Sequence, residues 1–119
     1  MQHLAKTKEE WELLLAGNEP GVVRSLDDWN ALRNAPDFAL RDLPSGDVQR
    51  FTDALEFRNG GLAHADYRHI KDKMTVAQYK QLWAHFGLSM KLIADYDDRW
   101  CDSPGNCIMR DSTVCTSNC

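Results

Sequence analysis

Apolar residues recur at helical spacing along most of this chain, and several of these runs begin directly after a Ser or Thr. The clearest case follows Thr75, where Gln78 stands three residues on and completes a capping box. The apolar face that follows consists of Val76, Tyr79, Leu82, Trp83 and Phe86. Gly87 stops the pattern, because glycine readily adopts the left-handed conformation that ends helices. The spacing predicts an amphipathic helix over this stretch.

Other segments show the same start signal. The further expected N-caps are Thr7, Ser25, Ser45 and Ser89. The apolar residues expected to face inward behind them are Trp11, Leu14 and Leu15; Trp29 and Leu32; Val48, Phe51, Ala54 and Leu55; and Leu92, Ile93, Tyr96 and Trp100. Gly17 or Asn18 would end the first of these helices, and Asn59-Gly60-Gly61 the third. Between residues 62 and 73 the pattern is weaker and suggests one more short helix.

The sequence therefore predicts an all-α protein, a single small domain of five or six short helices with an irregular cysteine-rich C-terminal tail. No stretch shows the strict alternation of apolar and polar residues that marks a half-buried strand. Residues 1–100 form the expected helical recognition or scaffold domain, and residues 101–119 form the cysteine-rich C-terminal segment. A turn is expected at 104–106, and a hairpin between Cys107 and Cys115 is an alternative that we do not adopt.

Length and charge narrow the function classes. A chain of 119 residues has room for one core. Its 18 acidic against 14 basic residues give a formal charge of -4. This balance argues against a nucleic-acid partner, because binding to phosphate backbones needs a concentrated basic face. The segment from Phe86 to Ser89 is similar to the turn of a helix-turn-helix. However, Trp83 stands where that motif has a small residue for close helix packing.

Nothing in the sequence indicates membrane insertion or classical secretion. The longest apolar run, Leu13 to Ala16, is far shorter than the ~20 residues that span a bilayer. Residues 1–6 turn polar at once and lack the apolar region of a signal peptide. We therefore expect a protein that is cytoplasmic when synthesised, with later export of a C-terminal fragment as a further option.

The four cysteines all lie in the C-terminal segment, in the spacing C-x5-C-x7-C-x3-C. They are Cys101, Cys107, Cys115 and Cys119. Four thiolates satisfy tetrahedral zinc, and a structural zinc site would give such a segment a fold. The spacing argues against zinc, because it contains no short C-x2-C or C-x4-C knuckle. The upstream histidines, each expected to be an ordinary surface or partly buried helix residue, are His64, His69 and His85. No cofactor is expected, and zinc belongs only to the alternative function below.

The even cysteine count also fits two disulfides, which allow three pairings. Two bridges would staple a segment that has too few apolar residues to fold alone. They require an oxidising compartment, and the missing signal peptide argues against one unless the chain leaves the cell by another route. The pairing stays open at this point.

The last nineteen residues hold four Cys, three Ser and two Thr, and a Gly60-Gly61 pair lies upstream. This layout resembles a ribosomally synthesised, post-translationally modified peptide precursor, with a leader and a Cys/Ser/Thr-rich C-terminal core. The resemblance implies that a modification enzyme recognises residues 1–100 and alters the cysteines, whose thiolates are strong nucleophiles. It also makes Gly60 and Gly61 a candidate leader-cleavage site, since double-glycine motifs mark such sites in exported peptides.

Two functions remain. The first is a precursor peptide whose helical region is recognised by a modification enzyme and whose C-terminal cysteines are modified. The alternative is a non-enzymatic interaction protein, of the immunity, inhibitor or phage type, with a C-terminal tail held by two disulfides or a metal. Both imply a protein partner. Neither is an enzyme, because the sequence shows no nucleophile elbow, phosphate loop or triad-like pattern.

Overall fold

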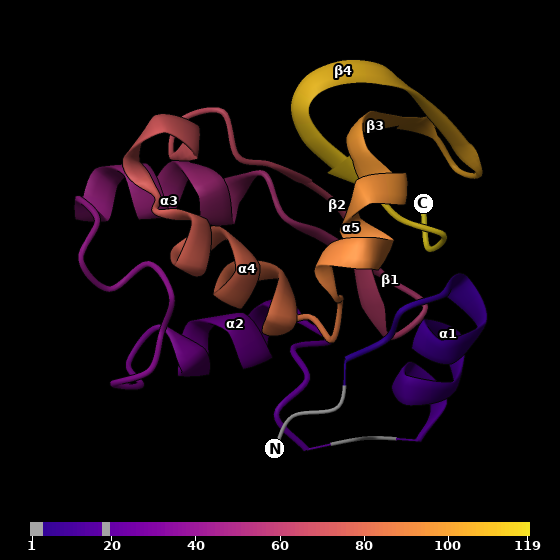
Figure 1. Ribbon diagram of the computed structural model, residues 1–119, viewed down its shortest axis with the longest axis horizontal. Helices are drawn as coiled ribbons and strands as arrows, with labels where there is room; N and C mark the ends of the chain where they lie inside the picture. Colours follow the sequence, from indigo (N-terminus) through magenta and orange to yellow (C-terminus); the bar gives the residue numbers. More distant parts are fainter. Residues whose placement is uncertain (1–3, 18–19) are drawn as a thin grey trace.

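A computed structural model, which describes residues 4–17 and 20–119, combines a group of helices with a four-stranded antiparallel sheet. The elements in chain order are α1 (Lys8–Ala16), α2 (Leu26–Leu32), α3 (Ser45–Asp53), β1 (Glu56–Arg58), β2 (Gly61–Asp66), the 3-10 helix η1 (Lys71–Lys73), α4 (Val76–Ala84), α5 (Met90–Tyr96), β3 (Asp97–Ser103) and β4 (Asn106–Cys115). Helices α2, α3 and α4 gather on one side of the molecule, and the β3–β4 hairpin stands on the other (Figure 1).

The expectation of an all-α fold is wrong, because two segments form an antiparallel sheet in the order β1-β2-β4-β3. The strand β2 escaped detection for a physical reason. It lies between β1 and β4, and its residues from Gly61 to Ala65 are all buried. A strand that is covered on both faces shows no alternation of apolar and polar residues. The fold is therefore mixed, with helices and a sheet sharing one small core.

The local start signals of the helices are confirmed at four of the five expected caps. The hydroxyl oxygens of Thr7, Ser25 and Ser89 each accept a hydrogen bond from the backbone N–H three residues on. Thr75 and Gln78 form the complete capping box. Ser45 is instead the first residue of α3, behind Pro44. In the described part of the chain, no helix is long and apolar enough to cross a membrane.

The expected helix ends are less accurate than the starts. Helix α1 is capped by Gly17, while Asn18, the other expected stop, lies outside the described residues. The third helix ends at Asp53, and strand β1 (Glu56–Arg58) follows where more helix was expected. The short helix expected between residues 62 and 73 is strand β2 followed by η1. Trp100, expected on the last helix, lies on β3.

An aromatic core holds the helices together, and we define it as Trp29, Phe38, Phe51, Trp83 and Phe86. The Trp29 ring stacks on Phe86, with ring centroids 5.5 Å apart and planes 11° from parallel. Trp29 also meets the ring edge of Phe38, with centroids 5.1 Å apart. Its indole N–H donates to the Thr52 hydroxyl oxygen over 2.9 Å. Every polar atom of this tryptophan is thus satisfied, and the core forms without a cysteine.

Residues 101–119 are not an irregular tail. Strand β3 runs from residue 97 into this segment, and β4 occupies half of it. Because β4 lies between β2 and β3, its end is deeply buried, with Val114 at 0% and Cys115 at 1% exposure. The segment therefore belongs to the sheet, and the end of β4 is buried in the folded body.

Candidate functional site

The cysteines lie on and beside the β3–β4 hairpin, which turns at Pro104 and Gly105. Gly105 has φ 80°, a left-handed conformation that glycine adopts without steric cost. The register then places Trp100 opposite Ile108 and Cys101 opposite Cys107. The local sequence thus supplies the turn, and the strands bring the first two cysteines into line.

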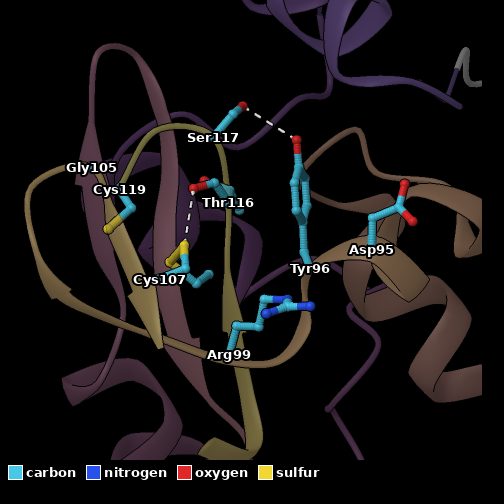
Figure 2. Close-up of a pocket in the computed structure, with 9 residues that line it drawn as sticks. Asp95, Tyr96, Arg99, Gly105, Cys107, Thr116, Ser117 and Cys119 are labelled. Atoms are coloured by element: carbon cyan, nitrogen blue, oxygen red, sulfur yellow. Dashed lines mark hydrogen bonds between the residues drawn. A yellow bond between two sulfur atoms is a disulfide. The ribbon is translucent and has the colours of Figure 1, made fainter. Parts of the chain in front are cut away.

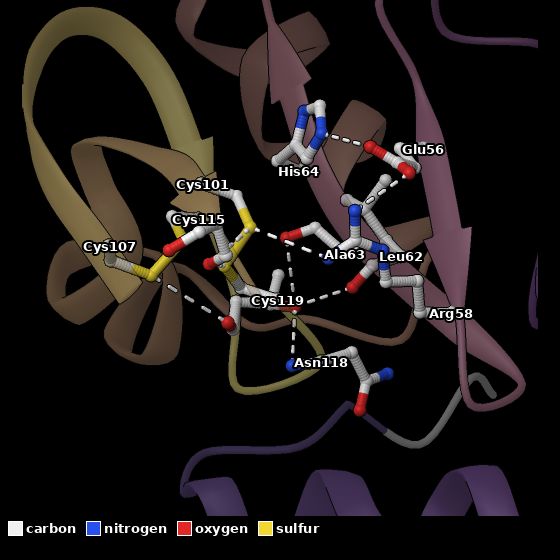
Figure 3. The surroundings of a disulfide bond; sticks show 12 residues. Glu56, Arg58, Leu62, Ala63, His64, Cys101, Cys107, Cys115, Asn118 and Cys119 are labelled. Carbon is white, nitrogen blue, oxygen red and sulfur yellow. Dashed lines mark hydrogen bonds and ion pairs between the residues drawn. A yellow bond between two sulfur atoms is a disulfide. The ribbon is translucent and has the colours of Figure 1, made fainter. Parts of the chain in front are cut away.

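Two disulfides join all four cysteines, as Cys101–Cys119 and Cys107–Cys115 (Figure 3). Their Cα atoms are 5.6 Å and 5.9 Å apart, within the usual range for a bridge. The facing cysteines of the hairpin, Cys101 and Cys107, are not bonded to each other. The sulfur atoms of Cys101, Cys115 and Cys119 all lie within 4.8 Å of one another. The two bridges therefore form one sulfur cluster rather than two separate cross-links.

The segment after β4 is held against β2 by hydrogen bonds. The Thr116 hydroxyl donates to the Leu62 carbonyl oxygen and lies 3.2 Å from that of Ala63. The same hydroxyl oxygen accepts from the Asn118 N–H over 3.0 Å. The Gly105 N–H donates to the Cys119 carbonyl oxygen over 3.0 Å. This network places Cys119 beside the hairpin, where it can meet Cys101.

The polar surroundings of the sulfur cluster are of mixed sign. The Arg58 guanidinium nitrogen lies 3.7 Å from the Cys101 sulfur. The sulfurs of Cys101 and Cys119 also lie 3.5 Å and 3.3 Å from the Ser103 carbonyl oxygen. Arg58 also donates to the Glu56 carboxylate over 2.9 Å, and this bond, with a second from His64, holds the pKa of Glu56 below its ordinary value. A cation is therefore fixed beside the cluster.

A surface cavity of about 370 Å³ opens onto the cluster (Figure 2). The residues that line it are Asp95, Tyr96, Arg99, Gly105, Cys107, Cys115, Thr116, Ser117 and Cys119. The Tyr96 hydroxyl donates to the Ser117 hydroxyl over 3.3 Å, and burial raises the pKa of Tyr96 above its ordinary value. Cys107, Cys115 and Cys119 line this cavity, so both disulfides contribute to its wall.

The base of the hairpin is anchored to the helices through Asp97. Its carboxylate accepts hydrogen bonds from the Tyr67 hydroxyl and, over 3.0 Å, from the Tyr79 hydroxyl of α4. Burial, as the main cause, raises the pKa of Tyr79 to about 12 and that of Tyr67 further. Both phenols therefore stay protonated as donors over the whole physiological range. This contact fixes where β3 leaves the helical part.

The hairpin bends just beyond this anchor. Asp98 and Ser112 have φ of 58° and 62°, in the left-handed region that non-glycine residues rarely adopt. The Ser112 N–H donates to the Asp98 carboxylate over 3.0 Å, which supports both conformations. The register of β3 and β4 shifts at the same point, as in a β-bulge. Strand β4 follows a strongly curved path in Figure 1.

The hairpin tip, which we define as residues 102–111, stands clear of the core. All its residues are exposed except Cys107, which is half-buried. Ile108 and Met109 are 41% and 75% exposed, so the tip presents apolar side chains to solvent. The tip residue Arg110 places its guanidinium 4.5 Å from the centre of the Trp100 ring, which also packs on His64 with centroids 4.3 Å apart.

The structure distributes the other predicted residues over the fold. Gly60 lies in the β1–β2 turn and Gly61 is the first residue of β2, so neither marks a helix end. A Cβ on Gly61 would come within 2.6 Å of the Leu15 side chain. His69 is exposed. His85 is buried among the helices, and its ring nitrogen accepts a hydrogen bond from the N–H of Ala39, which lies 46 residues earlier in the chain.

Sequence reasoning missed Arg58 and Arg110, which lie near the cysteines or beside Trp100. It also placed His64 and Trp100 on helices, which is wrong, because they lie on β2 and β3. His64 is the register partner of Cys115 across β2 and β4, a pairing that no local pattern announces. Of these residues, only Trp100 carried a local signal, because aromatic residues are enriched in strands.

Among protein-family models, curated proteins and solved structures, no match to this chain is found.

Proposed function

We propose that the protein is a non-enzymatic interaction protein that binds a protein partner through the tip of its disulfide-bonded hairpin. Of the two functions that the sequence suggests, the geometry supports this one better. A precursor core that awaits modification should be mobile and poorly packed. Here Val114, Cys115 and Thr116 are buried at 0%, 1% and 2% exposure.

One observation carries the proposal: an exposed hairpin tip rises from a cross-linked base. The tip offers Ile108 and Met109 to solvent, while the cysteines below it are bridged. Cross-links that fix a loop before binding reduce the entropy lost on association. Exposed apolar residues beside an arginine and an aromatic ring match the composition of protein–protein interfaces. The binding form carries both disulfides and therefore acts in an oxidising compartment.

The test compares two double variants as bait in an extract of the source organism, followed by titration with the purified partner. Ile108→Ser/Met109→Ser removes the apolar side chains of the tip. Leu13→Ser/Val76→Ser removes two other exposed apolar side chains, at 74% and 86% exposure, from helices α1 and α4. We expect the tip variant to bind at least about tenfold more weakly and the helix variant to bind as the natural protein does. Equal loss in both variants, or none in the tip variant, contradicts the proposal.

The intact mass of the protein from its native host separates the two functions. The proposal requires the sequence mass less two hydrogens for each of the two bridges. A larger change on the cysteines, or cleavage after Gly61, would favour the precursor function instead.

A further inference from the structure

We propose that the reduced cysteines form a zinc site, so that the sulfur cluster exists in two states, disulfide-bonded and zinc-bound. The ligands are the thiolates of Cys101, Cys107, Cys115 and Cys119. The inference concerns these side chains alone and does not rest on the binding role of the hairpin tip.

The first support is the convergence of the sulfur atoms. Three of them lie within 4.8 Å of one another in the described structure. Tetrahedral zinc thiolate sites have Zn–S distances of about 2.3 Å, which sets the sulfurs about 3.8 Å apart. Cys107 is bonded to a member of this trio and is released beside it when that bond opens. The four sulfurs therefore need only small shifts to surround one ion.

The second support is that the sheet supplies the proximity that the sequence spacing lacks. Zinc knuckles use closely spaced cysteines to place two ligands together. Here Cys101 and Cys107 face each other across two hydrogen-bonded strands, and Cys119 returns to them through the Thr116 network. The lack of a short knuckle is thus no argument against a zinc site, because the hairpin brings two cysteines together instead.

The third support is charge and access. A site of four thiolates and one Zn²⁺ carries a net charge of two minus, which a neighbouring cation stabilises. The Arg58 guanidinium lies 3.7 Å from the Cys101 sulfur and supplies that cation. The cavity lined by Cys107, Cys115 and Cys119 opens to solvent and admits both a reductant and the ion.

The exchange between the two states balances with a thiol reductant of the dithiol class. Each disulfide takes up two electrons and two protons, and one dithiol becomes a disulfide in return. The two bridges thus give four thiols, and Zn²⁺ binding displaces four protons from them. Oxidation by a disulfide of a small thiol reverses the sequence and releases the ion.

The experiment titrates ZnCl₂ into the full chain, with and without a phosphine reductant that does not itself offer a thiol to the metal. Native mass spectrometry counts bound zinc, and Co²⁺ substitution reports tetrahedral thiolate coordination by its visible absorption. We expect one zinc per reduced chain and none on the oxidised chain. Cys115→Ser, at the centre of the cluster, should abolish stoichiometric binding. Arg58→Gln should weaken it about 10–100-fold.

Two further variants keep the result unambiguous. His64→Gln, which alters the register partner of Cys115 but no thiol, should bind zinc as tightly as the natural chain. A chain with all four cysteines changed to Ser should bind none. The proposal is overturned if the reduced chain binds no zinc, and this holds whether or not the reduced chain remains folded. It is equally overturned if the oxidised chain or the four-serine chain binds as much as the reduced one.

Discussion

The helical part and the β3–β4 hairpin of this protein are stabilised in different ways. The aromatic core around Trp29 and Phe86 buries its rings completely and contains no cysteine. The hairpin tip, residues 102–111, has almost no core of its own, because nearly every one of its residues is exposed. Two disulfides and the Thr116 hydrogen bonds hold its base instead. One region is ordered by packing and the other by cross-links.

This difference explains how a short chain can present an exposed hairpin at all. An isolated two-stranded hairpin is marginally stable in water, and it gains little from apolar side chains that point into solvent. Cross-linking removes entropy from the unfolded chain and leaves the tip side chains free. The aromatic core then supports the base through the Asp97 anchor, at which both regions meet.

The largest difference in stability between the two regions is expected when a tryptophan in each is replaced by alanine. Trp29→Ala should lower the free energy of unfolding by about 3–5 kcal/mol, because it opens a cavity among fully buried rings. Trp100 is half-buried on β3, and Trp100→Ala should lower the free energy of unfolding by much less. Urea denaturation of both variants measures the difference. Equal losses would mean that the hairpin belongs to the same packed core.

The next effect comes from the disulfides. Replacing Cys101 and Cys119 by Ser opens a cross-link with a sequence separation of 18, and replacing Cys107 and Cys115 opens one of 8. Loop entropy then predicts that the free energy of unfolding falls by about 3 kcal/mol for the first pair and by about 2.5 kcal/mol for the second. Thermal unfolding in the absence of reductant provides the measurement. If neither pair of replacements lowers the melting temperature, the strands hold the hairpin without the disulfides.

Between about pH 6.5 and 5, a pH-dependent effect is expected from the helical part. His85 is buried, its ring nitrogen accepts the Ala39 N–H over 3.1 Å, and burial holds its pKa below the ordinary value of 6.5. The unfolded chain therefore takes up the proton first, and stability should decrease as the pH falls below about 6.5. The melting temperature of His85→Gln should lack this decrease between about pH 6.5 and 5, before the carboxylates titrate. An unchanged pH profile in that variant would contradict the assignment.

The smallest effect concerns the outer face of the hairpin. Arg110 lies over Trp100 and within 3.7 Å of the Asp66 carboxylate, with its side chain 39% exposed. Arg110→Gln should lower the free energy of unfolding by only about 0.5–1 kcal/mol, since contacts of exposed cations are weak. Urea denaturation at low and high salt tests this. If Arg110→Gln lowers the free energy of unfolding as much as the removal of a disulfide does, then part of the packed core extends into the hairpin.

The sequence predicts the parts of this structure that depend on neighbours along the chain. Helix starts at Thr7, Ser25, Thr75 and Ser89 are local, because a cap bonds to an amide three residues on. The inward positions of Trp11, Trp29 and Trp83 follow from the same periodicity.

The sheet depends on partners that are far apart in sequence. Strand β2 pairs with β4 about 50 residues later, as in His64 with Cys115, and burial on both faces removes its alternation. Trp100 fits a helix because it stands four residues after Tyr96, and the same position fits a strand. The cysteines were identifiable by type, but four of them allow three pairings. The hairpin register alone does not select one, because it places Cys101 opposite Cys107, while the bridges are Cys101–Cys119 and Cys107–Cys115.

Hydrogen exchange with and without reductant, read by mass spectrometry at the level of peptides, tests the central claim most directly. We expect reduction in zinc-free buffer to remove protection from the amides of β3 and β4, while those of α3 and α4 keep theirs. A reduced hairpin that stays protected, or a loss of protection spread evenly over the chain, would contradict the division into a packed region and a cross-linked one.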